Sequence, residues 1–104
     1  MDIDAAISRA VKGILEREHP IRIIVFGSAS RGDAHPDSDI DLIVVVPDGA
    51  STTAVNRSIR RVLIDPLVSF DVLVATESEL AGWKSDGWRL YDEIARDGKV
   101  VYAA

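Results

Sequence analysis

The segment that most restricts the fold is residues 39–46, where two aspartates lead into an unbroken apolar run. Its residues are Asp-Ile-Asp-Leu-Ile-Val-Val-Val, and a run of β-branched residues favours a strand. Residues two apart in a strand point to the same side, so Asp39 and Asp41 share one side of it. Ile40 and Leu42 then point to the opposite side, toward a core. We therefore expect a strand that presents two carboxylates together on one surface of a sheet.

Helical and strand patterns alternate along the rest of the chain, and Pro, Gly and polar residues separate them. The resulting order is α-β-β-α-β-α-α-β, which predicts the α+β class, as a small mixed β-sheet with helices packed on one face. The order of the strands in the sheet does not follow from this pattern. The predicted elements are a helix before His19-Pro20, a strand over 21–26, the strand over 39–46, a helix after the N-cap Ser51, a strand over 67–75, a helical stretch after the N-cap Thr76, a helix over 88–96 and a strand over 99–102.

Length and composition exclude several classes of protein. A chain of 104 residues with 47% hydrophobic and 28% charged residues fits one globular domain over residues 1–104. The absence of Cys excludes disulfides, a thiolate nucleophile and a cysteine zinc site, and two His make a histidine metal cage a poor expectation. The net charge of −5 disfavours broad binding to nucleic acid or to anionic membranes, since such binding depends on Lys and Arg.

The location of the protein is predicted from the apolar segments and from the N-terminus. The longest apolar run, Leu42–Val46, is far shorter than the roughly 20 residues of a membrane-spanning helix. The N-terminal residues are acidic and then helical in pattern, which is not typical of a signal peptide. We therefore expect a cytoplasmic protein without a membrane partner.

A third carboxylate, Asp71, interrupts the apolar strand predicted over 67–75. If this strand neighbours that of Asp39 and Asp41, Asp71 lies roughly 5 Å from them. At an effective dielectric near 20, each such pair of carboxylates costs about 3–4 kcal/mol. Bound cations or protons are therefore needed, and all-oxygen ligation favours Mg²⁺ or Mn²⁺. Two such ions suit in-line displacement at phosphorus, so the three aspartates are candidate metal ligands and catalytic residues.

A second group of candidates lies where the strand over 21–26 ends. Gly27 has no side chain, so its backbone can approach a phosphate closely. Backbone N–H groups in a turn after a strand form an anion site, and Ser28 adds a hydroxyl donor. Arg31 would fall on the same side of a helical turn, where its guanidinium could pair with phosphate oxygens. Gly27, Ser28 and Arg31 are therefore the candidate nucleotide-binding residues.

These residues together resemble a known family. Gly27-Ser28, ten further residues and Asp39-x-Asp41 form a pattern that, with Asp71 in a later strand, is similar to the minimal nucleotidyltransferases of the DNA polymerase β-like superfamily. The resemblance implies the nucleotidyltransferase fold and transfer of a nucleoside monophosphate from a triphosphate with Mg²⁺. It assigns Asp39 and Asp41 to metal binding, and Asp71 to metal binding and activation of the acceptor hydroxyl.

The small size of the chain bears on its acceptor, because we expect no second domain within 104 residues to hold an acceptor. Stand-alone members of this size resemble the antitoxins of toxin–antitoxin pairs, in which ATP serves to adenylylate a tyrosine of a helical HEPN-domain toxin. The expected state is then a hetero-oligomer with that toxin. Two alternatives stay open. One is a non-catalytic antitoxin that acts by occlusion, and the other is a nucleotidyltransferase subunit that acts on a small molecule or RNA.

Two further pairs of residues have structural interpretations. Trp83 and Trp88 are expected to close the core under a turn, with contact to a partner as the alternative. Arg60 and Arg61 are expected on the solvated side of the helix that follows Ser51.

Overall fold

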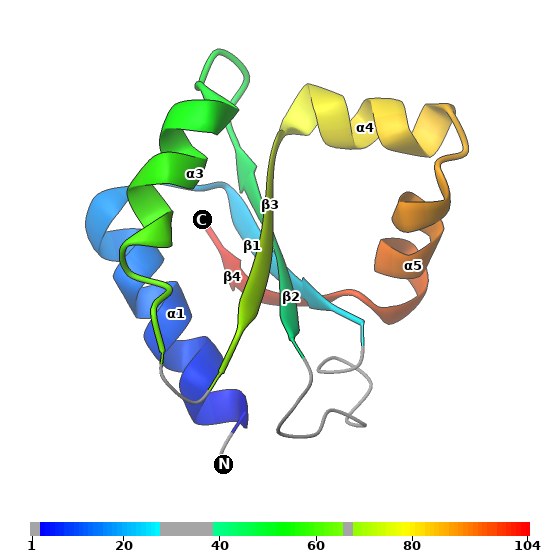
Figure 1. Cartoon of the computed structure of the whole chain (residues 1–104). Coiled ribbons are helices and arrows are strands. Elements are labelled where there is room, and N and C mark those ends of the chain that lie inside the picture. The colour runs from blue at the N-terminus through cyan, green and yellow to red at the C-terminus, as the bar shows by residue number, and fades with distance from the viewer. Residues whose placement is uncertain (1–2, 28–38, 66–67) are drawn as a thin grey trace.

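The computed structural model describes residues 3–27, 39–65 and 68–104, and in these residues a four-stranded sheet carries helices on both faces (Figure 1). The predicted order of elements, α-β-β-α-β-α-α-β, is confirmed. In the described parts of the chain, no helix combines the length and the apolar character that crossing a membrane requires. The elements are α1 (Ile3–Arg17), β1 (Arg22–Phe26), β2 (Ile40–Val46), α3 (Thr52–Arg60), β3 (Phe70–Thr76), α4 (Glu77–Ser85), α5 (Arg89–Asp97) and β4 (Lys99–Ala103).

The two predicted N-caps are confirmed by their hydrogen bonds. The Ser51 hydroxyl accepts a hydrogen bond from the backbone N–H of Ala54 at 3.2 Å, at the start of α3. The Thr76 hydroxyl accepts from the Glu79 backbone N–H at 3.1 Å, and the Glu79 carboxylate accepts from the Thr76 backbone N–H at 3.1 Å. This reciprocal pair is a capping box, which satisfies N–H groups that have no partner within the helix. It fixes the point at which β3 turns directly into α4.

The sheet is mixed, as predicted, and its strand order is β3-β2-β1-β4. β1 pairs antiparallel with both β2 and β4, whereas β2 pairs parallel with β3. A parallel pair needs a crossover connection, and α3 lies in the connection between β2 and β3. The third strand begins at Phe70, whereas the sequence predicts its start at residue 67. Val68 and Ser69 lie before the strand, and Leu67 lies outside the described residues.

The helices occupy both faces of the sheet, which corrects the prediction that they pack on one face (Figure 1). α1 and α3 cover one face, where their side chains pack on Ile40 and Leu42 of β2. α4 and α5 cover the other face, where Leu80, Trp83, Leu90 and Ile94 pack on Ile43. The reason is that β2 is apolar on both sides: every residue from Leu42 to Val46 is buried. Such an unbroken apolar run is typical of a strand covered on both faces.

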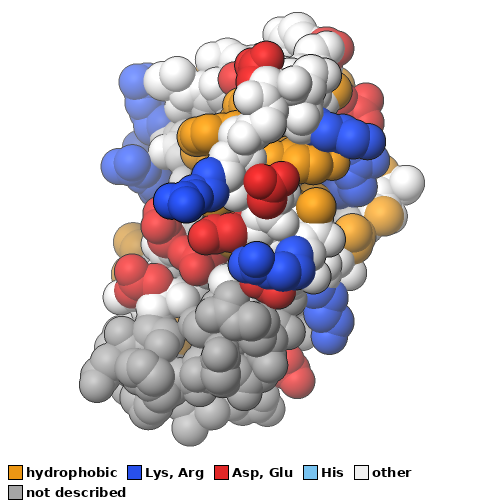
Figure 2. Space-filling model, turned by 90° about the vertical axis from the view of Figure 1, so that its right-hand side faces the viewer, with side chains coloured by type: hydrophobic (Ala, Val, Ile, Leu, Met, Phe, Trp, Pro, Cys, Tyr) orange, Lys and Arg blue, Asp and Glu red, His pale blue; other side chains and the backbone are white. Residues whose placement is uncertain are grey.

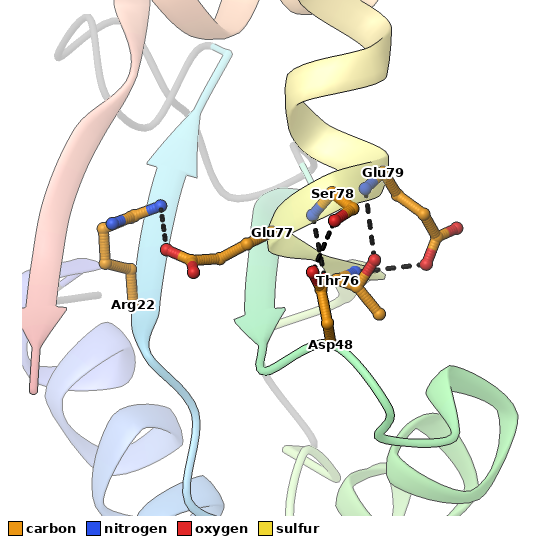
Figure 3. A network of polar contacts seen from close by, with 6 residues as sticks. All are labelled: Arg22, Asp48, Thr76, Glu77, Ser78 and Glu79. Atoms are coloured by element: carbon orange, nitrogen blue, oxygen red, sulfur yellow. Dashed lines mark hydrogen bonds and ion pairs between the residues drawn. The ribbon is translucent and has the colours of Figure 1, made fainter.

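A polar network holds the beginning of α4 against the rest of the sheet (Figure 3). Asp48, in the turn after β2, accepts hydrogen bonds from the backbone N–H of Ser78 at 3.0 Å and from the Ser78 hydroxyl. Arg22 of β1 forms an ion pair with Glu77 at 3.4 Å. The hydrogen bonds from Ser78 lower the pKa of Asp48. The network therefore fastens α4 at two points, and α5 continues from it across the same face.

Candidate active site

The structure places Asp41 and Asp71 side by side on neighbouring strands. β2 and β3 run parallel, and in their register Asp41 is the direct partner of Asp71. Ile40 and Leu42 point to the core formed with α1 and α3, so Asp41 points to the opposite face, which α4 and α5 cover. Asp39 lies immediately before β2 and is exposed, as is Asp71. The three candidate carboxylates thus lie at the same end of two adjacent strands.

The electrostatics of this region are dominated by acidic groups. Partial burial raises the pKa of Asp41, and the negative charges of Asp71, Asp39 and Glu93 raise it further, in that order. Figure 2 views the molecule from the side of α4 and α5, and acidic side chains gather in the middle of this face. Positive charge beside Asp41 would therefore stabilise its ionised form, which is the chemical character of a cation site.

Glu93 is a contributor to this site that the sequence did not reveal. It lies on α5, far along the chain from the Asp39-x-Asp41 segment, and helical periodicity places it only on the exposed part of that helix. Its effect on Asp41 arises because α5 packs across the same face of the sheet. No motif marks it, since its position depends on how α5 returns to the sheet.

Gly27 lies directly against Asp41. It follows Phe26, which pairs with Asp41 in the antiparallel register of β1 and β2. Its φ of +72° lies in the left-handed region that favours glycine. A Cβ added to Gly27 would lie 2.5 Å from the Asp41 Oδ2 atom, closer than real side chains approach. Glycine is therefore required here by both the turn and the carboxylate. The other two candidate nucleotide-binding residues, Ser28 and Arg31, lie outside the described residues.

The donor set fits a hard divalent cation in chemistry, although the side chains do not form a closed cage. Asp39, Asp41 and Asp71 offer only carboxylate oxygens, the ligands that Mg²⁺ and Mn²⁺ prefer. Within residues 3–27, 39–65 and 68–104, no three or more His, Cys, Asp or Glu side chains are grouped closely enough to hold a metal ion. The strand register places Asp41 beside Asp71, and the side chains of Asp39 and Asp71 are exposed to solvent.

The comparison with protein families identifies the fold that this geometry belongs to. The nucleotidyltransferase domain family matches residues 7–100, which is nearly the whole chain. The chain belongs to the nucleotidyltransferase domain family. No curated protein sequence matches it. Within this nucleotidyltransferase domain, Gly27, Asp41 and Asp71 come from three different parts of the sequence and meet at one end of the sheet.

Solved structures share the fold of this nucleotidyltransferase domain. A candidate minimal nucleotidyltransferase is 25% identical with a TM-score of 0.61, and the match covers 95% of each chain. A candidate nucleotidyltransferase from Sulfolobus solfataricus is 22% identical with a TM-score of 0.56, over 97% of this chain and 86% of that one. A chain of a toxin–antitoxin structure with AMP-PNP is 20% identical with a TM-score of 0.62, over 93% and 73%.

The tryptophan pair lies at the turn between α4 and α5. Trp83 and Trp88 meet edge to face with ring centroids 4.7 Å apart, and Trp83 of α4 packs against the core cluster on this face of the sheet. Trp88 is 44% exposed, so it closes the turn between the helices without being buried. A hollow of about 680 Å³ between α1 and β4 is lined by none of the candidate site residues.

Proposed function

We propose that this nucleotidyltransferase domain transfers AMP from ATP to a hydroxyl of a partner protein, and that the partner is a HEPN-domain toxin neutralised by the modification. The observation that carries the proposal is the register of Asp41 with Asp71, beside a glycine that leaves no room for a side chain. The nucleotidyltransferase family supports the class of reaction. A toxin–antitoxin structure with AMP-PNP has the same fold, which supports both an adenine nucleotide and a toxin partner.

In this proposal the acidic end of the sheet takes the reacting phosphate. When bound, divalent cations held by Asp39, Asp41 and Asp71 would neutralise the carboxylates and the charge that develops on the triphosphate. Gly27 leaves the turn open, so that backbone N–H groups can approach the phosphate oxygens. Ser28 and Arg31 keep their predicted roles, in which they donate hydrogen bonds to the phosphate oxygens.

The transfer itself forms one bond and breaks one bond. The acceptor hydroxyl oxygen attacks the α-phosphorus of ATP, and the bond from that phosphorus to the bridging oxygen of the β-phosphate breaks in line. Pyrophosphate leaves with the electron pair of that bond. Asp71 accepts the proton from the hydroxyl and passes it to solvent. Asp71 suits this task because it lies at the exposed edge of the pair, where an acceptor can approach it.

The test is a transfer assay with the chain, a purified candidate toxin, ATP and Mg²⁺. We expect the mass of the toxin to rise by AMP units and its toxicity to fall. Asp41→Asn and Asp71→Asn should each abolish the mass increase with the fold intact by circular dichroism. The matched control is Asp86→Asn, which removes an exposed carboxylate at the end of α4 and should leave transfer unchanged.

The same assay separates catalysis from occlusion. If the Asp41→Asn, Asp71→Asn double variant neutralises the toxin as well as the native chain does, the protein acts by binding alone. If a small molecule or RNA is labelled and the toxin is not, the acceptor is wrong and the transfer chemistry stands.

A further inference from the structure

β3, which carries Asp71, has one edge that pairs with no other strand among the described residues. β3 is at the end of the strand order, and in Figure 1 it is the front strand, with α3 beside it. The Ile40 N–H donates to the Ser69 carbonyl at 2.8 Å, which fixes the alternation of hydrogen bonds in this parallel pair. Backbone groups of Phe70, Val72 and Val74 therefore point away from β2. In the described part of the chain, no backbone hydrogen bond outside the sheet ladder involves them.

Two neighbouring hollows lie between β3 and α3, and together they are called the groove. Its first part, of about 230 Å³, is lined by side chains of α3 and by Phe70, Asp71 and Val72. Its second part, of about 240 Å³, is lined by the beginning of α3 and by Val74 and its neighbour. Asn56 borders both parts, so they follow each other along the strand. An extended segment of about the length of Phe70–Val74 would fit alongside β3, and it would pass Asp71.

The groove also carries a positive group, Arg60. Arg60 lines the first part of the groove together with Asp71, and its Nε atom donates to the Asn56 Oδ1 atom at 2.9 Å. Among the residues that the structure describes, no carboxylate forms an ion pair with Arg60. Arg60 was expected on the solvated side of its helix, and it is exposed, but it also borders this groove. An acidic group on the occupant would complement its charge.

We propose that the acceptor is an extended peptide segment that adds to the free edge of β3, with its hydroxyl beside Asp71 on the side of the sheet that α4 and α5 cover, and with an acidic side chain on the neighbouring residue against Arg60 on the α3 side. This inference rests on the proposed function, for which it names the form of the acceptor. Main-chain groups of a free strand edge match those of a peptide, and strand addition of this kind needs no particular sequence apart from the side chains in the pockets. The acidic net charge of the domain disfavours RNA as the occupant.

The test measures binding without nucleotide, by backbone amide shifts of the isotope-labelled chain. The probe is the peptide acetyl-Val-Glu-Tyr-Glu-Val-amide, whose acidic side chains lie on the opposite side of the strand from the tyrosine, and its control has every backbone nitrogen methylated. We expect the probe to shift the amides of Phe70, Val72 and Val74, and the methylated control to lose this effect. Equal shifts from the control, shifts concentrated on β4 at the opposite edge, or larger shifts from a single-stranded RNA oligonucleotide would each overturn the proposal.

Variants on α3 and β3 give an independent reading. Arg60→Ala should weaken binding of the probe about two- to fivefold, the range of an exposed ion pair. Arg57→Ala, which removes an exposed arginine of the same helix outside the groove, should not. Val74→Pro removes an outward N–H and leaves the bonds to β2, so it should abolish binding, whereas Val74→Ile should retain it. Equal affinities for the Arg60 and Arg57 variants would overturn the role of Arg60, even if the proline variant does not fold.

The outcome is separable from that of the proposed function. A chain that binds the probe at β3 and transfers no AMP refutes the transfer reaction and leaves the groove intact. A chain that transfers AMP to its toxin, and whose β3 amides do not respond to the probe, refutes the groove and leaves the reaction intact.

Discussion

Replacing Asp41 by asparagine should make the metal-free protein more stable. Asp41 and Asp71 are register partners on parallel strands, so their charges lie about 5 Å apart. Two unit charges at that distance repel by about 0.8 kcal/mol in water and by about 3 kcal/mol at an effective dielectric of 20. Because Asp71 is exposed, the repulsion energy between the two carboxylates lies near the lower of these two values. Partial burial of Asp41 adds a further cost to its ionised form. We expect the free energy of unfolding to rise by about 1–2 kcal/mol, which corresponds to roughly 5–10 °C in Tm.

The pH dependence of this gain has a definite sign. The folded pKa of Asp41 is raised above its ordinary value of 3.8. Below pH 3.8 the carboxyl is protonated in both the folded and the unfolded state, so it adds no penalty. The penalty appears as the pH rises through the folded pKa, and it is complete above that pKa. The advantage of Asp41→Asn is therefore full at pH 7 and disappears in acid.

The assay is thermal unfolding of both proteins with EDTA, over a pH series from 7 down to about 3.5. Asp86→Asn serves as the control, because this exposed carboxylate should give no comparable gain in Tm. The reasoning is refuted if Asp41→Asn is no more stable than the native chain at pH 7, or if its advantage persists unchanged at the acidic end of the series.

Three further substitutions test other parts of the account. Gly27→Ala should lower Tm, because an alanine at φ +72° costs about 1–2 kcal/mol, and should abolish transfer by displacing Asp41; normal transfer would contradict the close approach. Asp48→Asn should lower Tm above the unfolded pKa of Asp48, and the difference should vanish as the pH falls through the lowered folded pKa, as Tm against pH would show. Ile59→Ala should lower the free energy of unfolding in urea by about 2–5 kcal/mol, because Ile59 is a fully buried residue of α3, and a smaller loss would place it outside the core.

The helices and strands could be predicted from the sequence because the signals that mark them come from residues close together in the chain. Ser51 and Thr76 mark helix starts through hydrogen bonds to residues three positions on. The α+β class and the mixed sheet followed from the order of those elements. The placement of helices on one face was wrong, because that prediction overlooked what the unbroken run Leu42–Val46 indicates. A strand that is covered on a single face shows alternating apolar and polar residues. β2 does not alternate beyond Asp41.

The candidate site divides in the same way between local and long-range information. Strand periodicity predicts a common face for Asp39 and Asp41, but Asp39 lies immediately before β2, so this stays a prediction. The position of Asp71 depended on β2 and β3 being neighbours, which the sequence did not determine and which the register now gives. The pairing of Phe26 with Asp41, which brings Gly27 against the carboxylate, is also a long-range feature.

The stability of the site and its function should respond to Asp41 in opposite directions. A buried, apolar sheet gains nothing from a carboxylate whose ionised form is disfavoured by burial and by its neighbours. If Asp41 serves only structure, asparagine should be at least as good with or without Mg²⁺ and ATP. If it holds cations and nucleotide, those ligands should raise the Tm of the native chain through mass action and leave that of Asp41→Asn nearly unchanged. A variant that is more stable alone, and less stable than the native chain once Mg²⁺ and ATP are added, is the result that only a ligand-binding role for Asp41 explains.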